Sequence, residues 1–248
     1  MVRLVSILRP TSKPQGEMNM KRTLAFTAVA AAMALMGQMA VPVLADEGRG
    51  LEAVPFEFVG KAGDCGAAAG SRIVTAAWLK GMGLPDTDDP NKKDHHSGLL
   101  LSKNGPTPDC SAAGASIKGV KGMTVSETFE VGFDYRNGGH CGAGAPRFNV
   151  TTRDGVFSFV GGCSNGTASP APQDPLEWTR VRINVTSPSQ AFPPLAVGSQ
   201  IESISIIYDE GTDTATSDSL GVGLAVLDNI HVNGELITGR GYDGKDDD

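Results

Sequence analysis

Apolar and polar residues alternate with a period of two along much of this chain, as they do in half-buried β-strands. The clearest run covers residues 129–136. One face carries Phe129, Val131, Phe133 and Tyr135, and the other carries Glu130, Gly132, Asp134 and Arg136. A glycine-rich loop at 137–146 separates this run from two further runs, at 148–152 and 156–160, which flank a turn at 153–155. We therefore predict antiparallel strands with their rings inward and their charges outward.

The other apolar runs are short and are bounded by glycine, proline or polar residues. They predict strands at residues 54–59, 73–79, 99–101, 115–120, 177–186, 201–208 and 222–232. Pro55 places the first of these at a sheet edge or strand start, whereas residues 167–175, rich in proline and serine, predict a surface loop. About ten short strands without a long amphipathic helix predict an all-β fold. We expect an antiparallel two-sheet β-sandwich, and specifically a jelly roll.

The first 45 residues predict an export segment. Lys21 and Arg22 precede an apolar stretch at 24–36, and residues 43–45 end in Ala45, a small residue suited to cleavage. We predict cleavage after Ala45, a β-sandwich domain over 46–240 and an acidic disordered tail over 241–248. The apolar stretch is short for a membrane span. The mature protein is therefore expected to be secreted, extracellular or periplasmic, with no stable membrane span.

The charge of the predicted mature chain excludes some partners. Removing five basic and one acidic residue from totals of 21 and 28 leaves 203 residues with a formal charge of −11. An acidic surface does not attract nucleic acid or anionic lipid. It is compatible with cations and with neutral ligands.

Four cysteines follow the predicted cleavage site and would mature in an oxidising compartment. They allow three pairings. A hairpin centred on 153–155 brings residue 163 opposite residue 145, which favours Cys141 with Cys163 and, by subtraction, Cys65 with Cys110. Neighbouring strand residues point to opposite faces, so His140 is not expected to activate Cys141 as a nucleophile.

A crowded acidic loop follows the strand predicted at 201–208. Carboxylates in one loop repel each other unless they are hydrated or bind a metal, and hard cations prefer oxygen ligands. The predicted ligands of a structural calcium ion are Asp209, Glu210, Asp213 and Asp228, and the alternative is a solvated acidic loop. The polar stretch 85–96 is a second acidic segment, but Pro90 stands where a helix-loop-helix calcium loop needs glycine. A solvated connection is preferred there.

Two resemblances can be named on these residues. Segments 97–110 and 133–150 resemble those of a group of uncharacterised secreted bacterial proteins, which implies no activity. Residues 226–234, Val-Leu-Asp-Asn-Ile-His-Val-Asn-Gly, are similar to the closing strand of jelly-roll carbohydrate-binding modules. That likeness implies that the first and last strands pair and that a structural calcium lies near Asp228.

Sugar-binding modules usually offer an aromatic ring to the apolar face of a sugar, with polar groups nearby. Trp178 is out of phase with Val181 and points outward, or else it is buried or bulged. We predict that Asp134, Arg136, Trp178 and Arg180 bind a polysaccharide or cell-surface glycan. For Asp134 and Arg136, an exposed ion pair is the simpler alternative. Aromatic residues make up only 6% of the chain, a departure from the module pattern.

A hydrolase on the same scaffold is the alternative function. Glycosidases place two carboxylates on either side of a bond, and Glu130 and Asp134 share one strand face. Four residues of strand separate them by about 13 Å, too far for either usual spacing. We therefore expect a non-catalytic protein. A structural protein of the envelope, without a small ligand, is the third possibility.

Overall fold

The computed structural model describes residues 50–61, 63, 73–85, 96–213 and 223–239. The predicted export segment, Cys65, most of the polar stretch 85–96 and the predicted acidic tail lie outside the described residues. Among those that are described, no helix is long and apolar enough to cross a membrane.

The strands form two antiparallel sheets, as predicted. Sheet A contains, in spatial order, β1 (Glu52–Phe58), β4 (Ala112–Lys118), β11 (Ile201–Tyr208), β6 (Arg147–Thr152), β7 (Phe157–Gly161) and β10 (Ala191–Phe192). Sheet B contains β2 (Ile73–Leu79), β3 (Gly98–Asn104), β12 (Leu224–Val232), β5 (Glu130–Arg136), β9 (Trp178–Asn184) and β8 (Thr167–Pro170), with β13 (Glu235–Ile237) paired to β12. A 3₁₀ turn, η1 (Cys163–Asn165), links β7 to β8.

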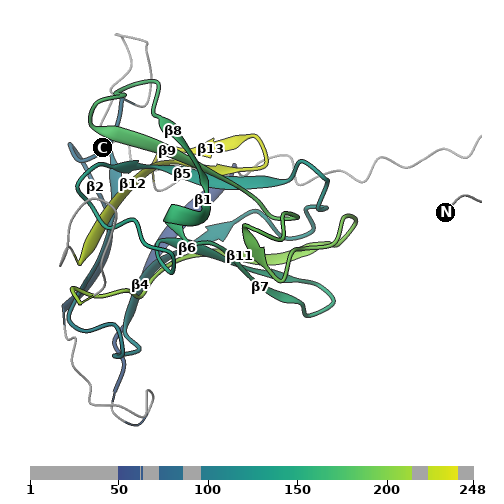
Figure 1. Ribbon diagram of the computed structural model, residues 1–248, viewed down its shortest axis with the longest axis horizontal. Coiled ribbons are helices and arrows are strands. Elements are labelled where there is room, and N and C mark those ends of the chain that lie inside the picture. The colour runs from purple at the N-terminus through teal and green to yellow at the C-terminus, as the bar shows by residue number, and fades with distance from the viewer. Residues whose placement is uncertain (1–49, 62, 64–72, 86–95, 214–222, 240–248) are drawn as a thin grey trace, which may run out of the picture. The chain divides into compact units, whose positions relative to one another are not determined.

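The chain passes repeatedly between the sheets and encloses one apolar core in a jelly-roll sandwich. Figure 1 shows β5 and β9 in one layer and β6, β7 and β11 in the other. The inward residues follow the predicted period of two; for example, Phe133 of β5 and Phe148 of β6 stack across the core with their ring centroids 5.8 Å apart. Both rings are fully buried.

Several local details differ from the sequence predictions. Residues 167–170, expected in a surface loop, form the short edge strand β8, and β10 and β13 were not expected. The implied pairing of the first and last strands does not occur among the described strands, because β1 pairs with β4 in sheet A and β12 lies inside sheet B. Short exposed strands such as β8 have no apolar period, since their pairing comes from the backbone alone.

The hairpin of β6 and β7 has the predicted register. Arg147 pairs with Gly161, which brings the preceding loop beside η1, and a disulfide joins Cys141 to Cys163 with their Cα atoms 5.0 Å apart. Cys110 is disulfide-bonded as well; its predicted partner, Cys65, is outside the described residues. Cys141 is thus a bridge residue and not a free nucleophile.

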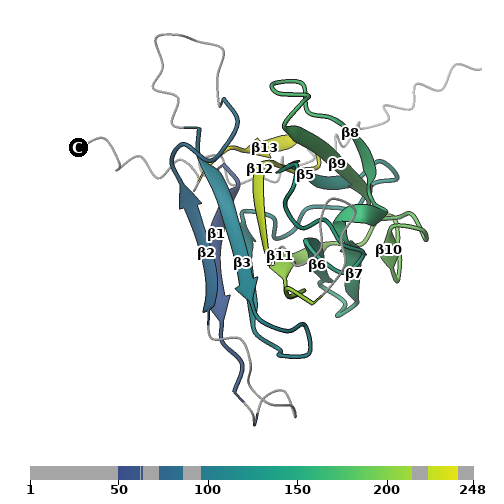
Figure 2. The ribbon, with the colours of Figure 1, turned by 60° about the vertical axis from the view of Figure 1, so that its left-hand side comes forward.

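Side chains join the edge strands β1 and β2, which lie next to each other (Figure 2). The indole of Trp78 donates a hydrogen bond to the carbonyl of Ala53 (2.8 Å), and the backbone N–H of Ala76 donates to the carboxylate of Glu57 (2.9 Å). These two bonds connect sheet A to sheet B along one edge of the sandwich.

Candidate functional site

The predicted ligand-binding residues lie on the outer face of sheet B, but Asp134 is not open to solvent there. Its side chain is 0% exposed. It accepts hydrogen bonds from Arg180 Nε (2.9 Å) and Nη2 (3.0 Å) and from Asn229 Nδ2 (2.8 Å). Arg182 Nη1 lies 3.5 Å from the same carboxylate. The expectation of an outward, accessible Asp134 is wrong, because two arginines of β9 and the bulge of β12 cover it.

Trp178 resolves the two alternatives left by the sequence. It points to the outer face with Arg180, yet it is only 4% exposed because it packs in a small apolar cluster with Leu84, Ala171 and Val226. The ring is therefore not offered as a platform for a ligand. Among the four predicted residues, Arg136 is exposed and Arg180 keeps 25% of its side chain accessible.

Glu130 and Asp134 do not flank an open site, so the hydrolase reading gains no support from them. Glu130 Oε1 lies 3.7 Å from both Arg182 Nε and His231 Nδ1. His231 Nε2 accepts a hydrogen bond from the N–H of Gly234 (3.0 Å). Burial, together with the positive charges of Arg182 and Arg180, lowers the pKa of His231 to about 4. The imidazole is consequently neutral at physiological pH.

The four predicted calcium ligands do not converge. Asp209 binds both terminal nitrogens of Arg147 (2.6 and 2.7 Å), while Asp213 accepts two hydrogen bonds from Thr107. Asp228 lies on β12 and accepts the N–H groups of Leu84 and Asn229 (both 2.6 Å). In the part of the chain that the structure describes, no group of three or more His, Cys, Asp and Glu side chains is arranged to hold a metal ion.

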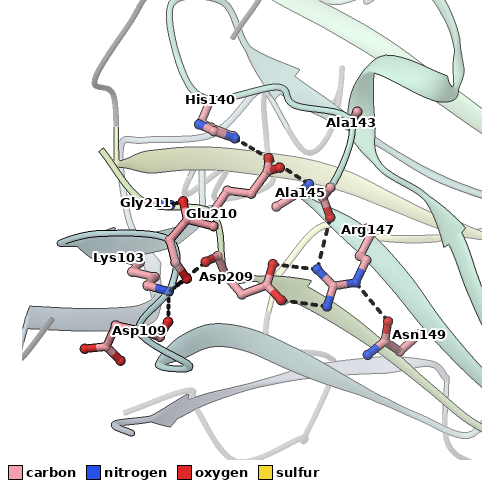
Figure 3. Close-up of polar contacts among 12 residues, drawn as sticks. Lys103, Asp109, His140, Ala143, Ala145, Arg147, Asn149, Asp209, Glu210 and Gly211 are labelled. Carbon is pink, nitrogen blue, oxygen red and sulfur yellow. Dashed lines mark hydrogen bonds and ion pairs between the residues drawn. The ribbon is translucent and has the colours of Figure 1, made fainter. Parts of the chain in front are cut away.

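The positive charge next to the acidic loop is the ammonium group of a lysine. Lys103 is 0% exposed, and its ammonium donates to the carbonyls of Thr107 (3.1 Å), Asp209 (2.8 Å) and Asp109 (Figure 3). Burial lowers its pKa, against the opposing effect of Asp109, Asp209 and Asp213. The sequence analysis missed this residue. A signal was present, since Lys103 is in phase with the buried Leu99 and Leu101 of β3.

The glycine-rich loop holds the last of the four predicted ligands, Glu210. Its carboxylate accepts hydrogen bonds from His140 Nε2 (2.7 Å) and from the N–H of Ala145 (3.1 Å). Gly142 and Gly144 pack so tightly on this carboxylate that a Cβ atom at either position would overlap with it. His140 is fully buried. This arrangement fixes the loop and leaves no accessible reactive group on it.

The outer face of sheet A presents exposed aromatic rings. Phe157 is 54% exposed and Phe192 is 50% exposed. Phe159 lies between them, because it follows Phe157 by two residues on β7 and pairs directly with Phe192 of β10. We call Phe157, Phe159 and Phe192 the aromatic strip. A large apolar patch that is open to water commonly marks a binding surface.

Polar side chains border the aromatic strip on the same face. The guanidinium of Arg147 stacks over the ring of Phe159, 4.4 Å from its centroid, and donates from Nε to Asn149 Oδ1 (3.1 Å). Asn149 pairs with Phe159, and Thr151 pairs with Phe157. Directly paired residues of antiparallel strands point to the same face. Rings and hydrogen-bonding groups thus lie side by side.

The same face continues into a groove. Asn149 pairs with Ser205 of β11, and Ser205 pairs with Ser116 of β4. A concavity of about 320 Å³ lies at this position. We call it the β4–β11 groove; it is lined by Ser116, Ile117, Lys118, Gly119, Val120, Lys121, Glu202, Ser203, Ile204 and Ser205.

Sequence reasoning missed the aromatic strip, although a signal for it existed. The turn at 153–155 fixes the register of the hairpin, and that register places Phe157 opposite Thr151 and Phe159 opposite Asn149. Phe148, Val150 and Thr152 form the inward face of β6. The two phenylalanines of β7 therefore had to point outward. The period of β7 alone did not reveal this, since both of its faces carry apolar residues.

No protein-family model matches this chain, and no curated protein matches its sequence. The resemblance to uncharacterised secreted bacterial proteins thus gains no support. A solved structure with a likeness is the family 11 carbohydrate-binding module of the cellulosomal cellulase Lic26A-Cel5E of Clostridium thermocellum, with 16% identity, TM-score 0.38, and coverage of 78% of this chain and 93% of that chain. Another is a family 11 module from Clostridium thermocellum in complex with a β-1,3-1,4-mixed-linked tetrasaccharide, with 16% identity, TM-score 0.38, and coverage of 76% and 98%. At this identity and TM-score, the likeness does not bear on the ligand of this chain.

Proposed function

We propose that this protein is exported and binds carbohydrate without catalysis, through the outer face of sheet A. The observation that carries the proposal is the aromatic strip, in which Phe157 and Phe192 are about half exposed beside Arg147 and Asn149. The apolar face of a sugar stacks on such rings, and the hydroxyl groups of the sugar need hydrogen-bond donors and acceptors beside the rings. The strip supplies the rings, and Arg147 and Asn149 beside it supply polar groups.

The proposed site differs from the one predicted from the sequence. Asp134 and Trp178 on sheet B are buried and have their partners within the protein. Phe157 and Phe192 on the outer face of sheet A expose their rings to solvent. Polysaccharide remains the proposed ligand, and its place moves to the opposite sheet.

Two observations support export and binding without catalysis. The Cys141–Cys163 disulfide is typical of proteins that mature in an oxidising compartment. Asp209, which holds the guanidinium that stacks on Phe159, has both oxygens bound to Arg147. An acid held in this way is a poor candidate for proton transfer to a glycosidic bond.

Affinity electrophoresis of the mature protein through gels that contain xylan, mixed-linkage glucan, hydroxyethyl cellulose or pectin tests the proposal. We expect retardation in at least one gel. Phe157→Ala should weaken that binding by about tenfold, because removing a stacked ring costs about 1.4 kcal/mol. The matched control is Phe58→Ala, a phenylalanine of β1 that is 44% exposed at the other edge of the sheet.

Two results would count against the proposal. Free migration in every gel would remove carbohydrate as the ligand. Retardation that survives Phe157→Ala and Phe192→Ala but is lost in Arg136→Gln would return the site to sheet B.

A further inference from the structure

The β4–β11 groove has a charge that is unusual for this protein. The chain has a formal charge of −7, yet the groove contains two lysines and a single carboxylate. That carboxylate, Glu202, forms an ion pair with Lys121. Lys118 is exposed at the end of β4. Counted over its lining residues, the groove carries one positive charge in excess; Glu52 of β1 is the cross-strand neighbour of Lys118 on the same face.

Hydroxyl groups surround this charge on the same face. Ser116 and Lys118 alternate with the buried Ile117 on β4, and Ser203 and Ser205 alternate with the buried Ile204 on β11. The pairing of Ser116 with Ser205 turns all four polar side chains outward. An ammonium group with several hydroxyl groups is a donor-rich set, which suits an anionic oxygen.

The groove and the aromatic strip are close enough for one extended ligand. Only β6 separates β11 from β7 in sheet A, so two strand spacings, about 10 Å, separate Ser203 and Ser205 from the rings, and Lys118 on β4 is one spacing farther away. Asn149 lies between them, paired with Ser205 on one side and Phe159 on the other. A polysaccharide that lies across the strands would contact the aromatic strip, the side-chain amide of Asn149 and the β4–β11 groove in turn.

We propose that the β4–β11 groove binds the anionic substituent, carboxylate or sulfate, of an acidic polysaccharide whose neighbouring sugars stack on the aromatic strip. This inference rests on the proposed function and specifies its ligand class. The acidic surface elsewhere does not prevent such binding. Charges on exposed groups are largely screened beyond about 8 Å at physiological ionic strength, so acidic residues far from the groove have little effect on it.

The test compares polygalacturonate with its fully methyl-esterified form, which keeps the sugar chain and removes its charge. Binding is measured by isothermal titration calorimetry at 50 and 300 mM NaCl. We expect polygalacturonate to bind more tightly, with Lys118→Gln weakening it about five- to tenfold and leaving the ester unaffected. The control is Lys80→Gln, an exposed lysine just after β2 on the other sheet.

The outcomes separate the two proposals. Equal affinity for both polymers, unchanged in Lys118→Gln, would overturn the acidic-ligand inference and leave carbohydrate binding in place. Dextran sulfate bound in preference to polygalacturonate, and lost in Lys118→Gln, would support the groove with sulfate as its anion. Failure to bind these polymers and every neutral polysaccharide would overturn both proposals.

Discussion

Replacing Asp134 with alanine tests whether this carboxylate stabilises sheet B instead of binding a ligand. It accepts hydrogen bonds from Arg180 and Asn229 at 2.8 to 3.0 Å while its side chain is 0% exposed. The hydrogen bonds between Arg180 and Asp134 also raise the pKa of Arg180. Without the carboxylate, the guanidinium of Arg180 and the amide of Asn229 lose their acceptor in a place that water reaches poorly, and Arg182 loses a neighbouring negative charge.

The expected cost follows from these contacts. Removing one partner of a buried ion pair destabilises a protein by about 3–5 kcal/mol. Because Arg180 keeps 25% of its side chain exposed and regains some hydration, we expect the lower end, about 3 kcal/mol. The loss is a large part of the total stability of a typical domain, about 5–15 kcal/mol.

Urea unfolding of the oxidised protein, followed by the fluorescence of Trp178 and Trp78, measures this cost. With a slope of about 3 kcal/mol per molar urea, the midpoint of Asp134→Ala should fall by about 1 M. Glu177→Ala removes an exposed carboxylate just before β9 and should leave the midpoint unchanged. A shift below about 0.3 M, or loss of glycan binding at an unchanged midpoint, would refute the reasoning and restore Asp134 as a ligand residue.

Two further predictions concern largely buried basic side chains. The pKa of His231 is about 4 in the folded protein, below its ordinary value of 6.5. As the pH falls, the unfolded chain therefore binds a proton before the folded protein does. The free energy of unfolding should fall by about 2 kcal/mol between pH 6.5 and 4, after discounting for partial exposure. Thermal unfolding of the wild type and His231→Gln over that range checks this, and parallel curves would contradict it. Lys103→Met should cost about 2 kcal/mol, because three carbonyls lose their donor. Lys80→Met is the exposed control for urea unfolding, and equal midpoints for the two variants would show that the buried ammonium contributes nothing.

The periodic pattern predicted the strands well where one face is apolar. Residues 73–79 and 201–208 form β2 and β11 with the predicted bounds, and the hairpin turn correctly indicated the Cys141–Cys163 bridge. Alternation assigns a residue to a face but does not show what covers that face. Asp134 is covered by Arg180, which lies 46 positions away in sequence.

The candidate site was less accessible to sequence reasoning for the same reason. Phe157 and Phe159 looked like core residues until the register of β6 placed them beside Thr151 and Asn149. The acidic loop suggested a cation, and the structure places the ammonium of Lys103 next to it. Each error arose because a partner from another strand determines the environment of the residue.

The bonds between β1 and β2 affect how copies of this protein behave when they meet. An unpaired strand edge is a template on which another polypeptide can add a strand, and this is a common route to fibrils. Glu57 occupies the N–H of Ala76, while the opposite edges carry Pro170 at the end of β8 and Pro193 directly after β10. Proline has no N–H to donate. Continuous edge-to-edge pairing with another copy is therefore interrupted at both rims.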